Sequence, residues 1–199
     1  MKRIFLIGFF LSVFINISIY AGPFGLEMGM SISQVKEACN GRDPVKIQDD
    51  RYFVIPQKPH PYFTKYVVWI SQSEGLYYIK AIGADISTSV YGTALRSKFD
   101  DISSSLLKTY GASENYDFLM PNSIWDEPND WMRGLQKDER TLASVWTREK
   151  QSSLPESIQS ISLSANATDT ETGYLVLEYE FKNHEKADQL LKEQVDNVF

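Results

Sequence analysis

The sequence predicts an α+β protein made of two units in tandem, each with a helix laid on an antiparallel sheet, and the two units can share one sheet. Three observations predict this class. A helix candidate followed by a run of strand candidates occurs twice along the 199 residues. The clearest helix candidate has an apolar stripe, and the strand candidates are rich in aromatic and β-branched residues. The composition, with 43% hydrophobic and 23% charged residues, is that of a globular protein.

Residues 1–21 are expected to be a secretory signal peptide. Lys2 and Arg3 form a basic start, Ile4 to Tyr20 is almost wholly apolar, and Ala21 is a small residue at the expected cleavage point. The apolar stretch is short for a bilayer span and is interrupted by polar residues, which favours cleavage over an uncleaved anchor. Cleavage removes two basic residues and takes the formal net charge from −6 to −8. We therefore expect a periplasmic or secreted protein whose only link to the membrane is its export signal.

The first α+β unit is expected over residues 22–90. It opens with a short strand candidate at Phe24–Met30. Ser31 then fits a helix N-cap, and Gln34 three residues later completes a capping box. The helix is predicted over Ile32–Cys39, and the Asn40-Gly41 pair can supply the left-handed residue that ends it.

Three strands are expected in the rest of this unit. The candidates are Arg51–Ile55, Tyr62–Ser71 and Leu76–Ile86, and the last two are joined by a turn at Gln72–Gly75. The intervening segment contains Pro56, Pro59 and Pro61, which hold the chain extended and outside any helix. A proline-rich segment of this kind can be read by an aromatic groove, but a rigid connection between strands is the preferred interpretation.

The second α+β unit is expected over residues 91–199. Its helix begins at Thr93 and ends before Gly111, because apolar residues recur every three or four positions between them. These residues are Leu95, Phe99, Ile102, Leu106 and Tyr110. The expected strands are Tyr116–Leu119, Thr141–Arg148, Ser157–Ala165 and Tyr174–Lys182, and a final helix starts near His184. The strand at Tyr174–Lys182 alternates most clearly between apolar and charged residues, which is typical of a half-buried antiparallel strand.

The start of the folded region carries a family resemblance. Gly29-Met30-Ser31 followed by Gln34-Val35 resembles the opening of exported β-lactamase-inhibitor-like domains and of small outer-membrane-assembly lipoproteins. The match covers about ten residues and is largely the capping box itself. Two features depart from the pattern: there is no cysteine at the cleavage point, and Gly41-Arg42-Asp43-Pro44 is one residue longer than the usual Gly-x-Pro. The resemblance implies an exported binding fold rather than an enzyme.

Several kinds of chemistry are disfavoured by the residues present. The acidic balance and the lack of a basic cluster argue against nucleic acid as a partner. Cys39 is the only cysteine, which excludes an internal disulfide and a cysteine-based zinc site, and its apolar surroundings predict a buried, unreactive thiol. His60 and His184 are the only histidines, and neither belongs to a recognisable catalytic or zinc motif. No cofactor is expected.

The most informative segment is the polar stretch Pro121–Glu139, because long loops in compact domains are often functional. Within it, Trp125 and Trp131 flank the acids Asp126, Glu127 and Asp130. Tryptophan is favoured at the centre of protein interfaces, and acids around it suit a basic partner. Alternatively, each tryptophan packs against the core and holds the loop in place, and for either ring taken alone this interpretation is slightly preferred. The same acids could bind Ca²⁺, although their spacing is not that of an EF-hand.

These observations lead to one main functional hypothesis and two alternatives. We expect a protein-binding module, such as an inhibitor, an immunity protein or an envelope accessory factor. Its predicted contact residues are Trp125, Asp126, Glu127, Asp130 and Trp131. The first alternative is a carbohydrate-binding or carbohydrate-active protein that uses the same loop, because sugars stack on aromatic rings beside carboxylates. The second is a structural component of the envelope.

Overall fold

The computed structural model describes residues 22–150 and 153–196, and the predicted signal peptide lies outside them. The strands run over Val45–Gln48 (β1), Arg51–Val54 (β2), Phe63–Ser71 (β3), Gly75–Gly83 (β4), Ile86–Ser87 (β5), Glu114–Leu119 (β6), Arg140–Thr147 (β7), Ile158–Ala167 (β8) and Thr172–Phe181 (β9). The helices are Ile32–Ala38 (α1), Thr93–Tyr110 (α2), Trp131–Gln136 (α3) and His184–Asp196 (α4). Short 3-10 helices occupy Pro23–Gly25, Pro128–Asp130 and Arg148–Lys150.

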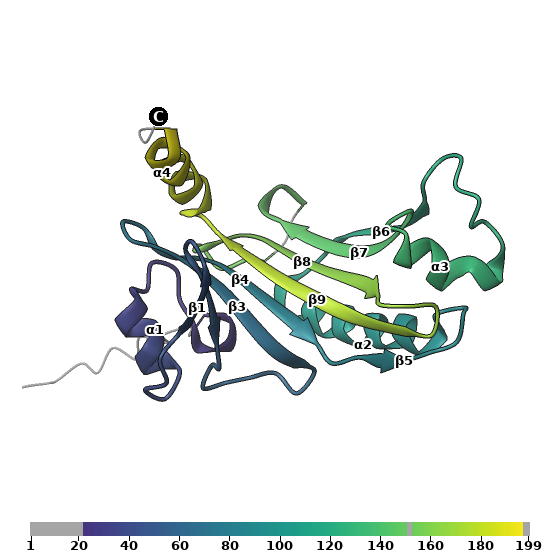
Figure 1. Cartoon of the computed structure of the whole chain (residues 1–199), viewed down its shortest axis with the longest axis horizontal. Coiled ribbons are helices and arrows are strands. Elements are labelled where there is room, and N and C mark those ends of the chain that lie inside the picture. The colour runs from purple at the N-terminus through teal and green to yellow at the C-terminus, as the bar shows by residue number, and fades with distance from the viewer. Residues whose placement is uncertain (1–21, 151–152, 197–199) are drawn as a thin grey trace, which may run out of the picture.

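All nine strands belong to one antiparallel sheet, which confirms the α+β class and joins the two halves of the chain (Figure 1). The main path of the sheet is β1-β2-β3-β4-β9-β8-β7-β6, and β5 pairs with β9 beside it. Each half is a meander of four strands preceded by a helix, and the last strand of one half, β4, pairs with the last strand of the other, β9. The two halves therefore meet at the centre of the sheet and leave β1 and β6 at its edges.

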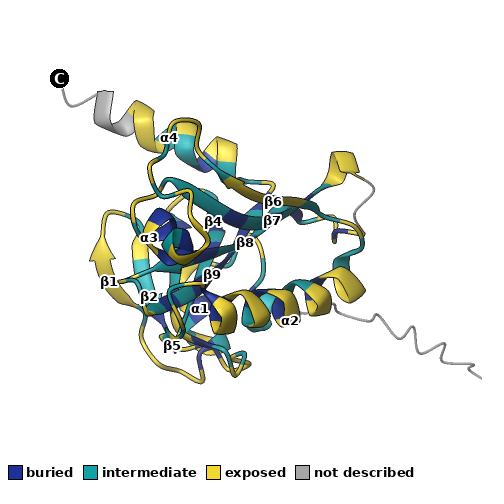
Figure 2. Ribbon diagram, turned by 90° about the vertical axis from the view of Figure 1, so that its right-hand side faces the viewer, coloured by how far each residue is buried: buried dark blue, intermediate teal, exposed yellow. Residues whose placement is uncertain are grey.

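The hydrophobic core lies on one face of this sheet. In β9, Leu175, Leu177, Tyr179 and Phe181 are buried, while Glu178 and Glu180 on the other face are half-buried. Helix α2 runs along the core face over β8 and β9 (Figures 1 and 2). It buries the apolar stripe expected from its sequence, namely Leu95, Phe99, Ile102 and Leu106. The opposite face of the sheet carries charged, serine and aromatic side chains and is not covered by α2.

The capping box predicted at Ser31 is present at the start of α1. The backbone N–H of Ser31 donates to Oε1 of Gln34 at 2.8 Å, and the backbone N–H of Gln34 donates to Oγ of Ser31 at 3.4 Å. These two bonds satisfy donors that the first turn of a helix leaves free. The helix ends before Asn40 and Gly41, both of which have positive φ, as the sequence indicates.

Three local expectations are corrected by the structure. Phe24–Met30 is not a strand but the end of a 3-10 helix followed by a hydrogen-bonded turn, and the ring centroid of Phe24 lies 4.9 Å from that of Tyr66. Strand β1 was not expected, because all four of its residues are exposed and show no alternation of burial. The stretch after Pro121 is not wholly irregular, because it contains α3.

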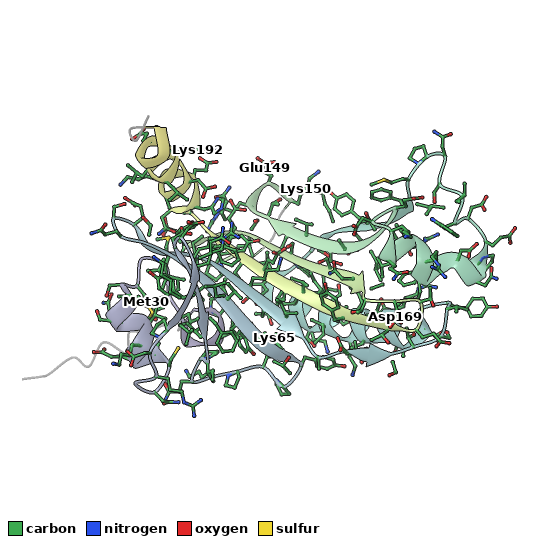
Figure 3. The ribbon with its side chains drawn as sticks, in the orientation of Figure 1. Met30, Lys65, Glu149, Lys150, Asp169 and Lys192 are labelled. Carbon is green, nitrogen blue, oxygen red and sulfur yellow. The ribbon has the colours of Figure 1, made fainter. Side chains whose placement is uncertain are left out.

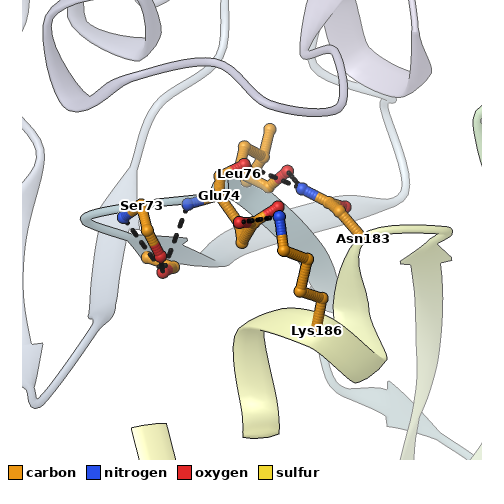
Figure 4. A network of polar contacts seen from close by, with 6 residues as sticks. Ser73, Glu74, Leu76, Asn183 and Lys186 are labelled. Atoms are coloured by element: carbon orange, nitrogen blue, oxygen red, sulfur yellow. Dashed lines mark hydrogen bonds and ion pairs between the residues drawn. The ribbon is translucent and has the colours of Figure 1, made fainter. Parts of the chain in front are cut away.

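The start of α4 is attached to the turn between β3 and β4 (Figure 4). The side-chain amide of Asn183 donates to the backbone carbonyls of Glu74 at 2.9 Å and Leu76 at 3.1 Å. Lys186, in the first turn of the helix, forms an ion pair with Glu74 at 2.7 Å. These contacts connect residues that are far apart in the chain and direct α4 away from the end of the sheet.

Cys39 is 1% exposed, as its apolar surroundings predict, and burial raises the pKa of its thiol. Because a thiol reagent attacks the thiolate and must reach the sulfur, we expect no modification of Cys39 in the folded protein at neutral pH. In concentrated urea the same residue should react fully. Absorbance of the released chromophore from a disulfide reagent checks this result, and rapid labelling of the folded chain would contradict it.

Candidate functional site

The acidic loop, residues 121–130, connects edge strand β6 to helix α3 and contains most of the predicted site residues. It leaves the sheet after Met120, whose N–H donates to the carbonyl of Glu139 at 2.7 Å. The N–H of Ser123 then donates to the carbonyl of Met120 at 3.2 Å, which makes a tight turn. The loop ends in the 3-10 helix Pro128–Asp130, and α3 follows at once. The polar stretch thus divides into an exposed loop and a short helix that packs on the sheet.

Trp131 is a core residue rather than a surface anchor. It is 6% exposed, and a Cβ atom built on Gly92 would lie 2.3 Å from its ring, so the two residues are in close contact. The guanidinium groups of Arg96 and Arg140 lie 5.4 and 5.8 Å from the ring centroid. This corrects the expectation that both tryptophans can contact a partner, because the Trp131 ring has almost no free surface.

Trp125 is half-buried and packs between the acidic loop and α3. The guanidinium of Arg133 lies 5.7 Å from the ring centroid, and the backbone N–H of Trp125 donates to Oγ of Ser123 at 3.2 Å. A Cβ atom built on Gly134 would lie 3.7 Å from Cβ of Trp125, which shows how near the loop comes to the helix. Arg133 approaches the Trp125 ring, where a sugar would have to stack, and this arrangement does not favour the carbohydrate alternative.

The three acids of the site remain at the surface. Asp126 and Glu127 are exposed, and Asp130 is half-buried. Within residues 22–150 and 153–196, none of the three forms an ion pair. No group of three or more histidine, cysteine or acidic residues in that part of the chain is arranged to hold a metal ion. The loop therefore presents negative charge that is not neutralised by neighbouring described residues.

A set of exposed apolar side chains next to these acids was missed by the sequence reasoning. We call it the β6 strip: Tyr116, Phe118, Met120 and Ile124, which are 39%, 46%, 47% and 72% exposed. Tyr116 and Phe118 are two residues apart and lie on the open face of the sheet, whereas Leu119 turns toward α3. Their alternation with polar residues is visible in the sequence, but only the strand order shows that β6 is an edge.

A concave region lies away from the acidic loop, between α1, the β1–β2 hairpin and α4. Its volume is about 670 Å³, and its lining includes Ile32, Tyr52, Leu190 and Leu191 together with Lys46 and Asp49. None of the predicted site residues borders it. Apolar and charged groups are mixed around this region, and no single ligand chemistry is indicated.

Comparison with protein-family models, with curated proteins and with solved structures finds no match to this chain. The resemblance to exported inhibitor-like domains therefore stays a prediction from the Met30-Ser31 capping segment. Among the helices that the structure describes, none is long and apolar enough to span a bilayer.

Proposed function

We propose that this protein binds a protein partner through the acidic loop and the β6 strip. The observation that carries the proposal is the exposure of four large apolar side chains in residues 116–124, directly before Asp126 and Glu127, which have no ion-pair partner in the described chain. When a partner buries exposed apolar groups, the free energy of the complex falls by roughly 25 cal/mol for each Å² of apolar surface removed from water. Clusters of this kind on a soluble protein are typical of interaction sites.

The charges around the strip define the partner further. Asp126 and Glu127 would attract basic residues, and the acidic balance of the whole chain acts in the same direction. Rim charges of this kind mainly increase the rate of association and select the partner, while the apolar centre supplies the affinity. An exported inhibitor, immunity protein or accessory factor in the bacterial envelope fits this surface.

Charge reversal in the acidic loop tests the proposal. We expect the double variant Asp126→Lys/Glu127→Lys to lose the protein that the native chain captures from an envelope extract, because both changes oppose a basic surface. Association with the purified partner should slow by at least about tenfold at low salt. Biolayer interferometry measures this rate, and its dependence on salt should weaken in the variant.

The matched control is Asp100→Lys/Asp101→Lys, which makes the same change in net charge on the exposed outer side of α2. This control should capture the same protein as the native chain.

Ile124→Ala should weaken binding because it raises the dissociation rate of the complex. The association rate and the folding of the variant should stay unchanged. Equal capture by the native chain and the loop variant would rule out the acidic loop as the interface.

A further inference from the structure

We propose that β6 is a docking strand, along which an extended basic segment of the partner adds to the sheet by backbone hydrogen bonds. This inference rests on the proposed function and adds the form of the partner to it. Addition of a strand to an exposed edge is a common way to recognise extended peptides, with side-chain pockets providing specificity. Strand addition at β6 is supported by the difference between the two edges of the sheet, by the direction of the β6 backbone groups and by the position of unpaired charge.

The two edges of the sheet differ in how they are protected. Natural edge strands are commonly protected by short length, by charged side chains and lysine above all, by proline or by a bulge. β1 has three of these features, since it has four residues, contains Lys46, and shifts register between Lys46 and Gln48. β6 has six residues, Glu114–Leu119, without lysine or proline, and it pairs with β7 in an unbroken register. Its two acids, Glu114 and Asp117, are held in ion pairs within the chain. The open edge is therefore β6.

The backbone of β6 is oriented for strand addition. Met120 bonds to Glu139 of the neighbouring segment, and backbone groups in an antiparallel ladder alternate in direction. The N–H and C=O groups of Tyr116 and Phe118 thus face β7, whereas those of Asn115, Asp117 and Leu119 face outward. No residue that the structure describes forms a hydrogen bond to these outward backbone groups.

The side chains along this edge define the segment that would fit. An added strand would place alternate residues over the open face, next to Tyr116 and Phe118, where apolar side chains suit. The acids within β6 are already compensated, because Glu114 pairs with Lys150 at 2.9 Å and Asp117 with Arg140 at 3.3 Å. Lys150 lies in the turn that follows β7 (Figure 3). The uncompensated charge is in the acidic loop, so basic residues of the partner belong beside that loop.

A partner segment fits this edge better than a second copy of the chain. The chain has a formal net charge of −6, so self-association would bring two acidic molecules together. A basic segment instead gains favourable charge at the acidic loop and apolar contact at the β6 strip. We therefore assign the edge to an extended segment with apolar residues at alternate positions over the β6 strip and with lysine or arginine at the end beside the acidic loop.

Amide exchange measured by NMR tests the assignment with a defined probe, a capped peptide that alternates valine and lysine. We expect this peptide to slow exchange of the outward amides of Asn115, Asp117 and Leu119. The inward amides of Tyr116 and Phe118 should change little, because they are already bonded to β7. A peptide that alternates valine and glutamate should have no effect. Failure of the lysine peptide to slow the three outward amides, or slowing at β1 instead, overturns the proposal.

Three variants separate the backbone from the side chain. Asp117→Pro removes one outward N–H and leaves the ladder with β7 intact, so peptide affinity should fall by about tenfold or more. Its stability should be close to that of Asp117→Ala, because both variants lose the same ion pair with Arg140. Asp117→Ala removes the carboxylate but keeps the N–H, and it should bind within about twofold of the native chain. Tyr116→Pro removes an inward N–H and should destabilise the sheet. Equal binding by Asp117→Pro and Asp117→Ala would overturn strand addition.

The same variants distinguish failure of this inference from failure of the proposed function. If Asp117→Pro still captures the partner while Asp126→Lys/Glu127→Lys does not, the interface stands and strand addition is wrong. If neither variant affects capture, the proposed function fails as well. Slow exchange of the outward amides without peptide, together with a dimer in analytical ultracentrifugation, would show that a second copy occupies the edge and would overturn the assignment to a partner.

Discussion

Trp131→Ala is expected to lower the free energy of unfolding by about 3–5 kcal/mol, the usual cost of removing a buried tryptophan. The ring is 6% exposed and packs directly against Gly92, so the variant leaves a cavity between α3 and the start of α2. The contacts of the ring with Arg96 and Arg140 are lost at the same time. Urea unfolding followed by circular dichroism measures the change in free energy.

Trp125→Ala is the matched variant against which the stability loss of Trp131→Ala is compared. Trp125 is half-buried at the base of the acidic loop, and its removal should cost only about 1 kcal/mol. The two tryptophans lie six residues apart in one polar stretch, yet we expect a difference of several kcal/mol between them. Equal losses of stability in the two variants would contradict the division between a core ring and a loop ring.

Gly75→Ala is expected to lower the free energy of unfolding by roughly 3 kcal/mol, because two effects act together. Gly75 begins β4 with φ +66°, a conformation that disfavours any residue with a Cβ atom. A Cβ atom there would also lie 2.2 Å from the carbonyl oxygen of Gly29. The segment at Gly29 cannot yield freely, because the N–H of Gly29 donates to the carbonyl of Leu76 and Met30 accepts from Leu76, both at 2.8 Å.

Gly41→Ala is a matched control for this prediction. Gly41 has a similar φ of +75°, but nothing lies within 4 Å of the position that a Cβ atom would occupy. Both variants therefore carry the conformational cost of about 1 kcal/mol, and only Gly75→Ala adds the clash with the backbone. Chemical denaturation of the two variants under the same conditions separates these terms. A Gly41 variant as unstable as the Gly75 variant would show that the clash is unimportant.

The elements that the sequence predicted well are those whose signal is local. The apolar stripe from Leu95 to Leu106 identifies α2, and the Ser31–Gln34 capping box identifies the start of α1. The alternation in Tyr174–Lys182 identifies β9. Each of these patterns arises because one face of an element is buried and the other is in water, and that difference is recorded within the element itself.

The elements that were missed lack such a signal. In β1 every residue is exposed, so there is no alternation of apolar and polar residues to detect. In α3 the helix has six residues and contains Gly134, which disfavours a helix by propensity. Gly134 packs closely there, because a Cβ atom would lie 3.3 Å from Cβ of Arg140 and 3.4 Å from Cδ1 of Leu119, which is tighter than usual contact. Tertiary contact overrides the local preference.

In the candidate site too, some features have a local signal in the sequence and others depend on contacts between distant residues. The amino-acid types in residues 121–139 already indicated acids and aromatic rings in one polar stretch, and the class of fold was recognisable from the repeated order of helix and strands. Which tryptophan is buried depended on the packing of α3 against the start of α2. Which strand is left at the edge depended on the pairing of β4 with β9 and of β6 with β7. These pairings join residues far apart in the chain, so their energies leave no pattern within a short segment. The exposure of the β6 strip follows from that long-range order.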